Sequence, residues 1–289
     1  MNTQTVTNCL IHLRLHYQLL LAPIFLWGYF LAGGYPDSRF WLAFVAFHLF
    51  LYGGLTAYNS YYDRDEGPVG GLEKPPPATA ILLPFSLTMQ LIGAAVAALV
   101  NRPFLLIYLV IFGLATAYSH PALRLKGRPL WGLLVVGLGQ GILAALGGWA
   151  VAEPTFSALE LRAWLGIVAV TLVTVGFYPI TQIYQIEEDL ARGDLTFAAW
   201  AGPTRTFIFA VTMQALAAFL LVAVIDSLLG LWQAVVVGLF YSALLAATIH
   251  WALHYESTQV IANFRRVMRM NQITSLGFLG FLVLHLFIS

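Results

Sequence analysis

The sequence predicts an all-α membrane protein, a polytopic bundle of about nine transmembrane helices. Its 289 residues are 60% hydrophobic and only 9% charged, whereas an ordinary soluble domain carries about 25% charged residues. The mean hydropathy is +0.81. Because one crossing takes about 20 apolar residues, the chain has room for about ten spans at most. This composition excludes a water-soluble globule, and we expect residues 1–289 to form a single transmembrane domain.

Four apolar segments in the first part of the chain are predicted to cross the membrane. They cover residues 16–33, 40–61, 79–100 and 103–119. Arg14 precedes the first segment and Arg39 the second. Three prolines at 75–77 precede the third segment, and Pro103 opens the fourth. Charged residues and prolines of this kind mark the ends of membrane helices. Each predicted span therefore begins next to a residue that ends or starts a helix.

Five further apolar segments complete the predicted bundle. They cover residues 131–151, 161–185, 205–225, 231–253 and 270–288. Pro129 precedes the first of these segments, and Glu160 precedes the second. Arg205 opens the third, Gly230 precedes the fourth and Arg269 precedes the fifth. Residues of the same types, namely proline, glycine and charged residues, therefore mark the boundaries of all nine predicted spans.

Residues 256–270 have the pattern of a basic amphipathic helix. Apolar side chains recur at helical spacing beside basic ones, at Val260, Ile261, Phe264, Arg265 and Arg269. Such a helix either lies in the membrane interface and contacts anionic headgroups, or forms the cytoplasmic start of the last span. A direct contact of these arginines with a diphosphate is a third interpretation.

The charged residues are distributed unevenly between the two membrane faces. With nine crossings, the N-terminus and the loops after the even-numbered spans lie on one face. That face carries eleven of the 14 basic residues, namely Arg14, Arg64, Lys74, Arg124, Lys126, Arg128, Arg192, Arg205, Arg265, Arg266 and Arg269. The positive-inside rule therefore predicts a multi-pass integral membrane protein whose N-terminus and even-numbered loops are cytoplasmic. The net charge of +1 gives no indication of nucleic-acid binding.

A first cluster of acidic residues follows the second span on this face. Asn59 and Asp63 are four residues apart, so they share one face of a helix. Asp65 and Glu66 follow directly. Carboxylate and amide oxygens are hard ligands that suit Mg²⁺, which usually joins one or two carboxylates to substrate phosphates.

A second acidic cluster follows the sixth span and repeats the same spacing. Gln185 and Asp189 are again four residues apart, and Glu187, Glu188 and Asp194 lie beside them. The two helix ends are thus expected to present matching oxygen ligands from opposite walls. Either cluster alone is explained by a solvated loop, but two clusters on one face favour a bound cation.

The loop after the fourth span adds positive charge at the same face. It contains Tyr118, Arg124 and Lys126, and a diphosphate needs cationic partners of this kind. Because all three loops follow even-numbered spans, we expect them to converge. The sequence therefore predicts an anion-and-metal site at a membrane mouth.

These residues resemble the UbiA superfamily of intramembrane prenyltransferases. That family has nine transmembrane helices, a motif N-D-x-x-D-x-x-x-D after helix two and a motif D-x-x-x-D after helix six. It also has a Tyr…Arg/Lys loop after helix four. The resemblance covers the chain from Arg14 through Asn59…Asp63 and Tyr118…Lys126 to Asp189 and its successors.

This chain departs from both family motifs at specific positions. Ser60 and Gly67 stand where the first motif has aspartates, and Gln185 replaces the first aspartate of the second motif. Asp63 and Asp189 are kept. We interpret the chain as a divergent branch in which nearby acids take over as metal ligands.

The resemblance implies transfer of a polyprenyl group from a polyprenyl diphosphate to an aromatic or other hydrophobic lipid acceptor, with Mg²⁺ as cofactor. The catalytic residues that it implies are Asp63, Asp189, Arg124 and Lys126. The implied substrate-binding residues are Arg14, Asn59, Arg64, Tyr118 and Gln185. The implied metal ligands are Asp63, Asp65, Glu66, Glu187, Glu188, Asp189 and Asp194.

Three other functions are compatible with parts of the sequence. The replaced aspartates also fit a non-catalytic descendant that binds a prenyl lipid or stabilises a membrane complex. A secondary transporter would place its carboxylates near the membrane midplane, whereas here they lie at helix ends. A CDP-alcohol phosphotransferase would carry a D-G-x-x-A-R run, which this sequence lacks.

Overall fold

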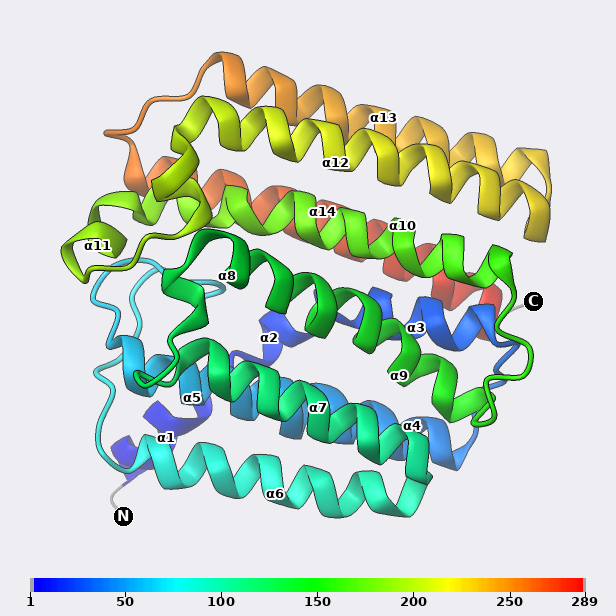
Figure 1. The fold of residues 1–289 in the computed structure, drawn as a ribbon, viewed down its shortest axis with the longest axis horizontal. Coiled ribbons are helices and arrows are strands. Elements are labelled where there is room, and N and C mark those ends of the chain that lie inside the picture. Colours follow the sequence, from blue (N-terminus) through cyan, green and yellow to red (C-terminus); the bar gives the residue numbers. More distant parts are fainter. Residues whose placement is uncertain (1–2, 288–289) are drawn as a thin grey trace.

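The computed structural model describes residues 3–287, and every named element in that range is a helix (Figure 1). Eight helical stretches there are long and apolar enough to cross a membrane, and the bent pair at the start supplies a ninth if it counts as one span. The predicted all-α bundle of about nine spans is therefore confirmed. The elements are α1 (Thr3–His12), α2 (Leu15–Gln18), α3 (Ala22–Leu31), α4 (Ser38–Val45), η1 (Ala46–Tyr52), α5 (Gly53–Asp63), α6 (Leu82–Val100), α7 (Arg102–Ser119), η2 (Leu125–Gly127), α8 (Pro129–Val136), η3 (Gly137–Ile142), α9 (Leu143–Ala152), α10 (Leu161–Phe177), η4 (Tyr178–Gln185), α11 (Ile186–Ala191), α12 (Phe197–Leu229), α13 (Leu231–Leu253) and α14 (Val260–Phe287).

The first span is not the continuous helix that was predicted over residues 16–33. The chain breaks between α2 and α3, and the segments Thr3–Gln18 and Ala22–Leu31 are bent by 45°. Just before α2, Arg14 takes a left-handed conformation with φ 50°. Its guanidinium donates hydrogen bonds to Ser60 Oγ and to the Gly70 carbonyl. These partners lie 46 and 56 residues away, so the local apolar pattern does not reveal the left-handed conformation at Arg14.

The sixth span also changes its helix type before it ends. An α-helix was predicted over 161–185, but α10 ends at Phe177 and the chain continues as the 3₁₀ helix η4 and then as α11. Pro179 lies at the start of η4, and proline cannot donate the next α-helical hydrogen bond. Gln185 and Asp189 therefore lie on either side of a change of helix, not on one α-helical face.

The last span begins earlier than predicted. The segment 270–288 was expected, whereas α14 starts at Val260 and runs without interruption to Phe287. Residues 256–270 had several interpretations, and the structure confirms that most of them form the start of the last span. Near this start, Asn263 Nδ2 donates a hydrogen bond to the Glu256 carbonyl oxygen at 2.8 Å.

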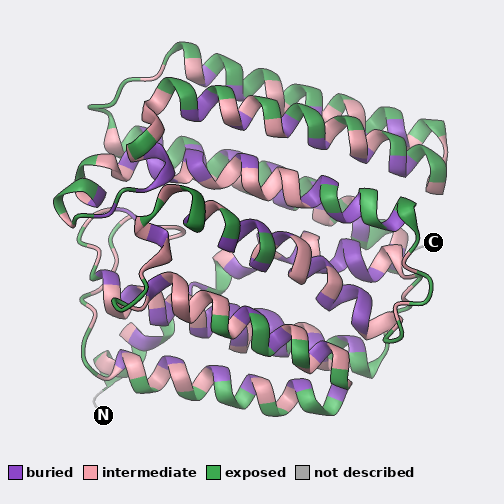
Figure 2. Cartoon of the chain, in the orientation of Figure 1, coloured by how far each residue is buried: buried purple, intermediate pink, exposed green. Residues whose placement is uncertain are grey.

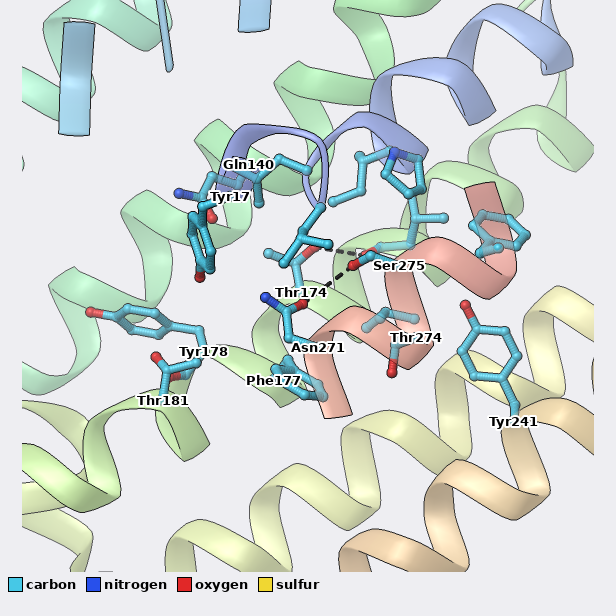
Figure 3. A pocket seen from close by; sticks show the side chains of 17 residues that line it. Tyr17, Gln140, Thr174, Phe177, Tyr178, Thr181, Tyr241, Asn271, Thr274 and Ser275 are labelled. Carbon is cyan, nitrogen blue, oxygen red and sulfur yellow. Dashed lines mark hydrogen bonds between the residues drawn. The ribbon is translucent and has the colours of Figure 1, made fainter. Parts of the chain in front are cut away.

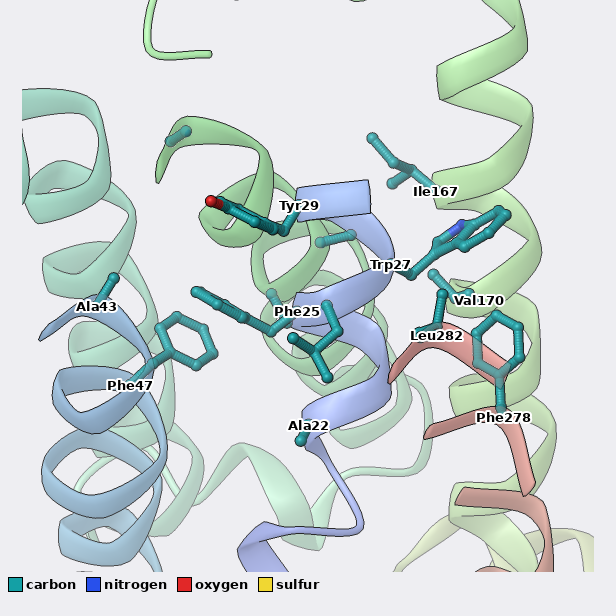
Figure 4. Close-up of a cluster of buried hydrophobic side chains, with 14 of the residues drawn as sticks. Ala22, Phe25, Trp27, Tyr29, Ala43, Phe47, Ile167, Val170, Phe278 and Leu282 are labelled. Carbon is teal, nitrogen blue, oxygen red and sulfur yellow. The ribbon is translucent and has the colours of Figure 1, made fainter. Parts of the chain in front are cut away.

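Helix α3 lies at the centre of the bundle and packs closely on α9. A Cβ at Gly28 would lie 1.8 Å from the Ala145 carbonyl oxygen, and one at Gly148 would lie 1.8 Å from the Phe25 carbonyl oxygen. Only glycine permits this approach. Figure 4 shows Phe25 and Trp27 among buried side chains of the neighbouring helices.

The outer helices expose apolar side chains, as membrane helices do. Figure 2 shows much exposed surface on α6 and α13, while α3 and α9 are largely buried. Leu99, Phe219 and Trp232 are each more than two-thirds exposed. In water such a surface would drive association, whereas in a bilayer it contacts lipid tails. The chain is a multi-pass integral membrane protein.

Three connections meet at one end of the bundle, as the even-numbered loops were expected to do. Figure 1 shows the end of α5, the start of α8 and α11 at the same end as the N-terminus. The end of α9, the start of α10 and the C-terminus lie at the opposite end.

Candidate active site

Charged side chains from these connections surround a cavity of about 150 Å³, which we call the mouth cavity. They come from the end of α5, from the α7–α8 connection and from the region of α11. The charged residues that line it are Asp63, Asp65, Lys126, Asp189, Arg192 and Asp194.

The first wall of the mouth cavity is built on Asp63, the last residue of α5. Its side chain is 4% exposed. Lys126 Nζ forms an ion pair with Asp63 Oδ1, and an Arg124 Nη atom lies 3.6 Å from the same oxygen. Both cations come from the turn after α7, where the His120 carbonyl accepts hydrogen bonds from Leu123 N and Arg124 N.

The second wall is built on Asp189 in α11. Arg192, three residues later, lies 3.0 Å from Asp189 Oδ1, and Thr196 Oγ1 donates to Asp189 Oδ2 at 3.2 Å. Arg192 also reaches across the cavity to Asp65 Oδ1, at 2.5 Å. Burial alone would lower the Arg192 pKa, but hydrogen bonds and charge from Asp65 and Asp189 outweigh it and raise the pKa above its ordinary value.

A bidentate pair fixes the turn that carries Lys126. Arg124 Nε and Nη2 donate to the two oxygens of Asp194 at 2.6 and 2.7 Å, and these bonds raise the Arg124 pKa. Leu195 N also donates to the Gly127 carbonyl. A Cβ at Gly127 would lie 2.6 Å from Asp194 Oδ1. Glycine at this position therefore allows the segments around residues 127 and 194 to approach each other closely.

Arg14 is a buried cation held by neutral groups. It is 5% exposed and donates to Ser60 Oγ at 2.7 Å and to the Gly70 carbonyl at 3.2 Å. Within residues 3–287 no carboxylate lies within ion-pair distance of it. A buried unpaired charge is costly, so this position favours an anionic ligand.

Neutral polar side chains complete the mouth cavity. Asn59 Nδ2 donates to Ser119 Oγ at 3.0 Å, and the hydroxyls of Tyr118 and Tyr178 are 2.9 Å apart. Gln185 Nε2 donates to the Pro68 carbonyl at 3.0 Å.

Several predicted site residues lie outside the mouth cavity. Arg64 takes a left-handed conformation that ends α5, and its side chain is exposed. Glu66 and Glu187 are also exposed, the latter on the outer side of a short helix. Glu188 lies at the rim, 3.4 Å from Arg192. The structure therefore does not bring Arg64, Glu66 or Glu187 to the site that the sequence assigned to them.

Other residues of the cavity were not given a site role from the sequence. Arg192 was counted only as a basic residue of one face, although its i, i+3 spacing from Asp189 was a local signal. Thr196 and Gln182 also line the cavity. Gln182 Oε1 accepts from Ala198 N at 3.2 Å, which joins η4 to the start of α12.

Two further cavities lie behind the mouth. One of about 220 Å³ shares Asn59, Gly70 and Tyr118 with it and has aliphatic walls from Leu55, Ile111, Leu114, Ala115, Val135 and Val136. We call it the aliphatic cavity. The other, of about 110 Å³, lies between α3, α10 and α14.

Figure 3 shows the smaller cavity, with Tyr17, Tyr178 and Thr181 on one side and Tyr241 across from them. Tyr17, Tyr178 and Thr181 line all three cavities. They therefore stand where the three spaces meet.

The donor atoms of the mouth cavity suit Mg²⁺. Oxygens are available at Asn59, Asp63, Asp65 and Asp189, and Asp65 Oδ2 is buried without a hydrogen-bond partner in the described range. No group of three or more His, Cys, Asp or Glu residues within 3–287 is arranged to hold a metal by itself. The donor set thus fits an ion that takes its other ligands from phosphate and water.

A profile of the UbiA prenyltransferase family matches residues 21–273. The chain belongs to the UbiA prenyltransferase family. The resemblance seen in the motifs is thereby confirmed over most of the chain.

Two named relatives in this family match part of the chain. A digeranylgeranylglyceryl phosphate synthase of Methanothrix thermoacetophila is 30% identical over 166 residues, 56% of this chain and 59% of that protein. A protoheme IX farnesyltransferase of Aeropyrum pernix is 30% identical over 146 residues, 47% of this chain and 46% of that protein. The matched region thus spans about half the length of these relatives.

Solved structures of UbiA homologues share the fold. A homologue from Archaeoglobus fulgidus bound to GPP and Mg²⁺ has a TM-score of 0.66 and 17% identity, covering 94% of this chain and 99% of that one. An apo homologue from Aeropyrum pernix has a TM-score of 0.65 and 25% identity, covering 92% and 97%.

Proposed function

We propose that this protein transfers a polyprenyl group from a polyprenyl diphosphate to a hydrophobic or aromatic acceptor, with Mg²⁺ as cofactor, at the cytoplasmic face of a membrane. The observation that carries the proposal is the junction of a charged mouth cavity with the aliphatic cavity behind it. A diphosphate needs the first and a polyprenyl tail needs the second. The excess of basic residues at this end of the bundle supports the cytoplasmic assignment.

Cations of the first wall are suited to hold the diphosphate. Lys126 and Arg124 contact Asp63, and in this proposal they exchange that carboxylate for phosphate oxygens. Arg14 needs no exchange, because its present partners are neutral. Mg²⁺ held by the mouth carboxylates supplies further positive charge for the leaving diphosphate.

Breaking the allylic C–O bond leaves its electron pair on the diphosphate and a positive charge on the prenyl carbon. Tyr118 and Tyr178 lie at the junction of the cavities, where their ring faces can stabilise that charge. The acceptor then donates an electron pair to the prenyl carbon, forms the new bond and loses a proton. The two relatives are named for a glyceryl phosphate and for a haem, so we propose no single acceptor within the hydrophobic and aromatic classes.

A transfer assay on the purified protein in lipid nanodiscs tests this proposal. Labelled geranylgeranyl diphosphate, Mg²⁺ and a panel of phenolic, quinone, tetrapyrrole and glycerolipid acceptors should give diphosphate release and a labelled product. Asp63→Asn and Asp189→Asn should lose turnover, whereas Asp226→Asn, at the opposite end, should keep it. Equal loss in all three variants would refute the site. Failure to bind donor or to release diphosphate would refute the function.

A non-catalytic role in binding a prenyl lipid is the second candidate. It is favoured by Ser60, Gly67 and Gln185, which replace three family aspartates. Donor binding that persists without Mg²⁺, with no product from any acceptor, would support this role over transfer.

A further inference from the structure

One guanidinium joins the two carboxylate walls of the mouth cavity. Arg192 Nη1 lies 2.5 Å from Asp65 Oδ1, on the first wall, and Nη2 lies 3.0 Å from Asp189 Oδ1, on the second. Arg192 Nη1 also lies 3.4 Å from the Asp63 carbonyl oxygen and 3.4 Å from Glu188. A positive charge therefore already stands between the two walls.

No neighbouring acid replaces the missing carboxylate of the second wall. Gln185 is neutral, and its amide nitrogen is directed to the Pro68 carbonyl. Glu187 is exposed, and the Glu188 carboxylate lies against both Arg192 and Gly67. Asp194 is engaged at both oxygens by Arg124. Asp189 also lines the cavity, and within residues 3–287 no cation from another segment forms an ion pair with it. Its ion-pair partner is Arg192, three residues later.

The first wall offers more ligand atoms for a metal ion once Lys126 and Arg124 exchange Asp63 for phosphate oxygens, as proposed above. Asn59 and Asp63 lie four residues apart on α5 and both line the cavity. The Asn59 amide donates through Nδ2 to Ser119, which leaves its oxygen as a ligand. Asp65 Oδ2 is buried and unpartnered among the described residues.

We propose that Arg192 takes the place of a metal ion at the second wall, so that the protein binds a single divalent cation with the diphosphate, at the Asn59–Asp63 wall. This inference rests on the proposed diphosphate site. A guanidinium carries a permanent charge and a planar set of five donors, so it can hold two carboxylates and still contact a phosphate. Arg192 Nε is buried and has no hydrogen-bond partner within residues 3–287, and Arg192 lines the cavity. We expect a diphosphate oxygen bound in the cavity to accept a hydrogen bond from this N–H.

Counting bound Mn²⁺ tests the proposal on the wild-type protein. The protein in detergent is loaded with Mn²⁺ and inorganic pyrophosphate, passed through a desalting column, and analysed for metal content and by electron paramagnetic resonance. One Mn²⁺ per chain is expected, with the spectrum of an isolated ion. Two ions per chain with a spin-coupled spectrum, or no bound ion, would overturn the proposal.

Two variants separate the effect of Arg192 from that of Gln185. Gln185→Asp alone restores a carboxylate but keeps Arg192, so it should still bind one Mn²⁺. The double variant Gln185→Asp/Arg192→Gln should bind two. If the single variant already binds two ions, Arg192 does not exclude the metal and the proposal fails.

Matched controls keep the result independent of folding and of turnover. Arg265→Gln removes an exposed arginine paired with Glu73 outside the cavity and should leave the count at one. Monodisperse elution and a cooperative thermal unfolding transition establish folding for each variant. A protein that binds one Mn²⁺ but transfers no prenyl group would uphold this inference and refute the proposed function.

Discussion

The two walls of the mouth cavity differ in where their positive charge comes from. Asp63 is neutralised by Lys126 and Arg124, more than 60 residues later in the sequence. Asp189 is neutralised by Arg192, one helical turn away. The cations of the first wall belong to a separate connection, so in the proposed function they can exchange partners when a diphosphate binds. The charge of the second wall is fixed by its own segment.

Among changes to the cations and the groups that support them, Lys126→Met should give the largest effect, because it removes the buried cation of the first wall. We expect kcat/KM for the donor to fall by about 10²–10³-fold, the size of the loss when one preorganised donor to a transition-state charge is removed. Kinetics with the acceptor at saturation measure this. Lys74→Met, at an exposed loop position, should be neutral. A comparable loss in both would mean that charge on this face acts non-specifically.

Asp194→Asn should give the next largest effect, because it loosens the turn that carries Lys126. The bidentate partner of Arg124 is weakened, at a cost of about 1–3 kcal/mol. The donor KM should rise about tenfold and kcat should change less. A fall in kcat with an unchanged KM would instead place Asp194 in the chemical step.

Thr196→Val probes the second wall, where we expect a smaller change. It removes the hydroxyl that donates to Asp189 Oδ2 and leaves Arg192 in place. Loss of a hydrogen bond to a charged group costs about 1.5–3 kcal/mol when buried, but Arg192 still compensates Asp189. Donor affinity measured by calorimetry should fall by less than tenfold. If Thr196→Val lowered kcat/KM for the donor as much as Lys126→Met does, the two walls would not differ.

The exposed pair Glu73–Arg265 should have the smallest effect. Its hydrogen bond from Arg265 lowers the Glu73 pKa, so the pair is intact above the ordinary glutamate pKa and is lost as the pH falls through the lowered value. Exposed pairs are weak and screened by salt. A double-mutant cycle of melting temperatures, with Glu73→Gln and Arg265→Gln, should show coupling at pH 7 in low salt and none in 0.5 M salt.

Most of the fold was predictable because membrane crossings have a strong local signal. The span 231–253 coincides with α13, since a long apolar run bounded by Gly230 needs no further information. The breaks were harder to predict. Pro179 is a local sign of the one after α10, although η4 also packs against α12 and α14. The left-handed conformation of Arg14 before α2 accompanies contacts with groups 46 and 56 residues away.

The sequence was less informative about the site than about the fold. Asp63, Asp189, Arg124 and Lys126 come together because helix ends and a short turn position them. For Arg64 and Glu66 in the loop after α5, and for Glu187 in α11, spacing alone does not say which way a side chain faces. Arg64 itself takes the left-handed conformation that ends α5, and its side chain is exposed. The sequence has no local sign of that conformation.

The charges of the mouth are almost balanced, and this has a consequence for the speed of substrate entry. Asp63, Asp65, Asp189, Asp194 and, at the rim, Glu188 face Lys126 and Arg192 of the mouth cavity and the adjacent Arg14 and Arg124. A cluster whose charges nearly cancel projects little field beyond a Debye length of about 10 Å in 0.1 M salt. The association rate of the donor should therefore vary little with ionic strength, unlike that of electrostatically steered enzymes. In the proposed function, specificity for the diphosphate is then expected to arise after contact, when ion pairs are exchanged inside the cavity.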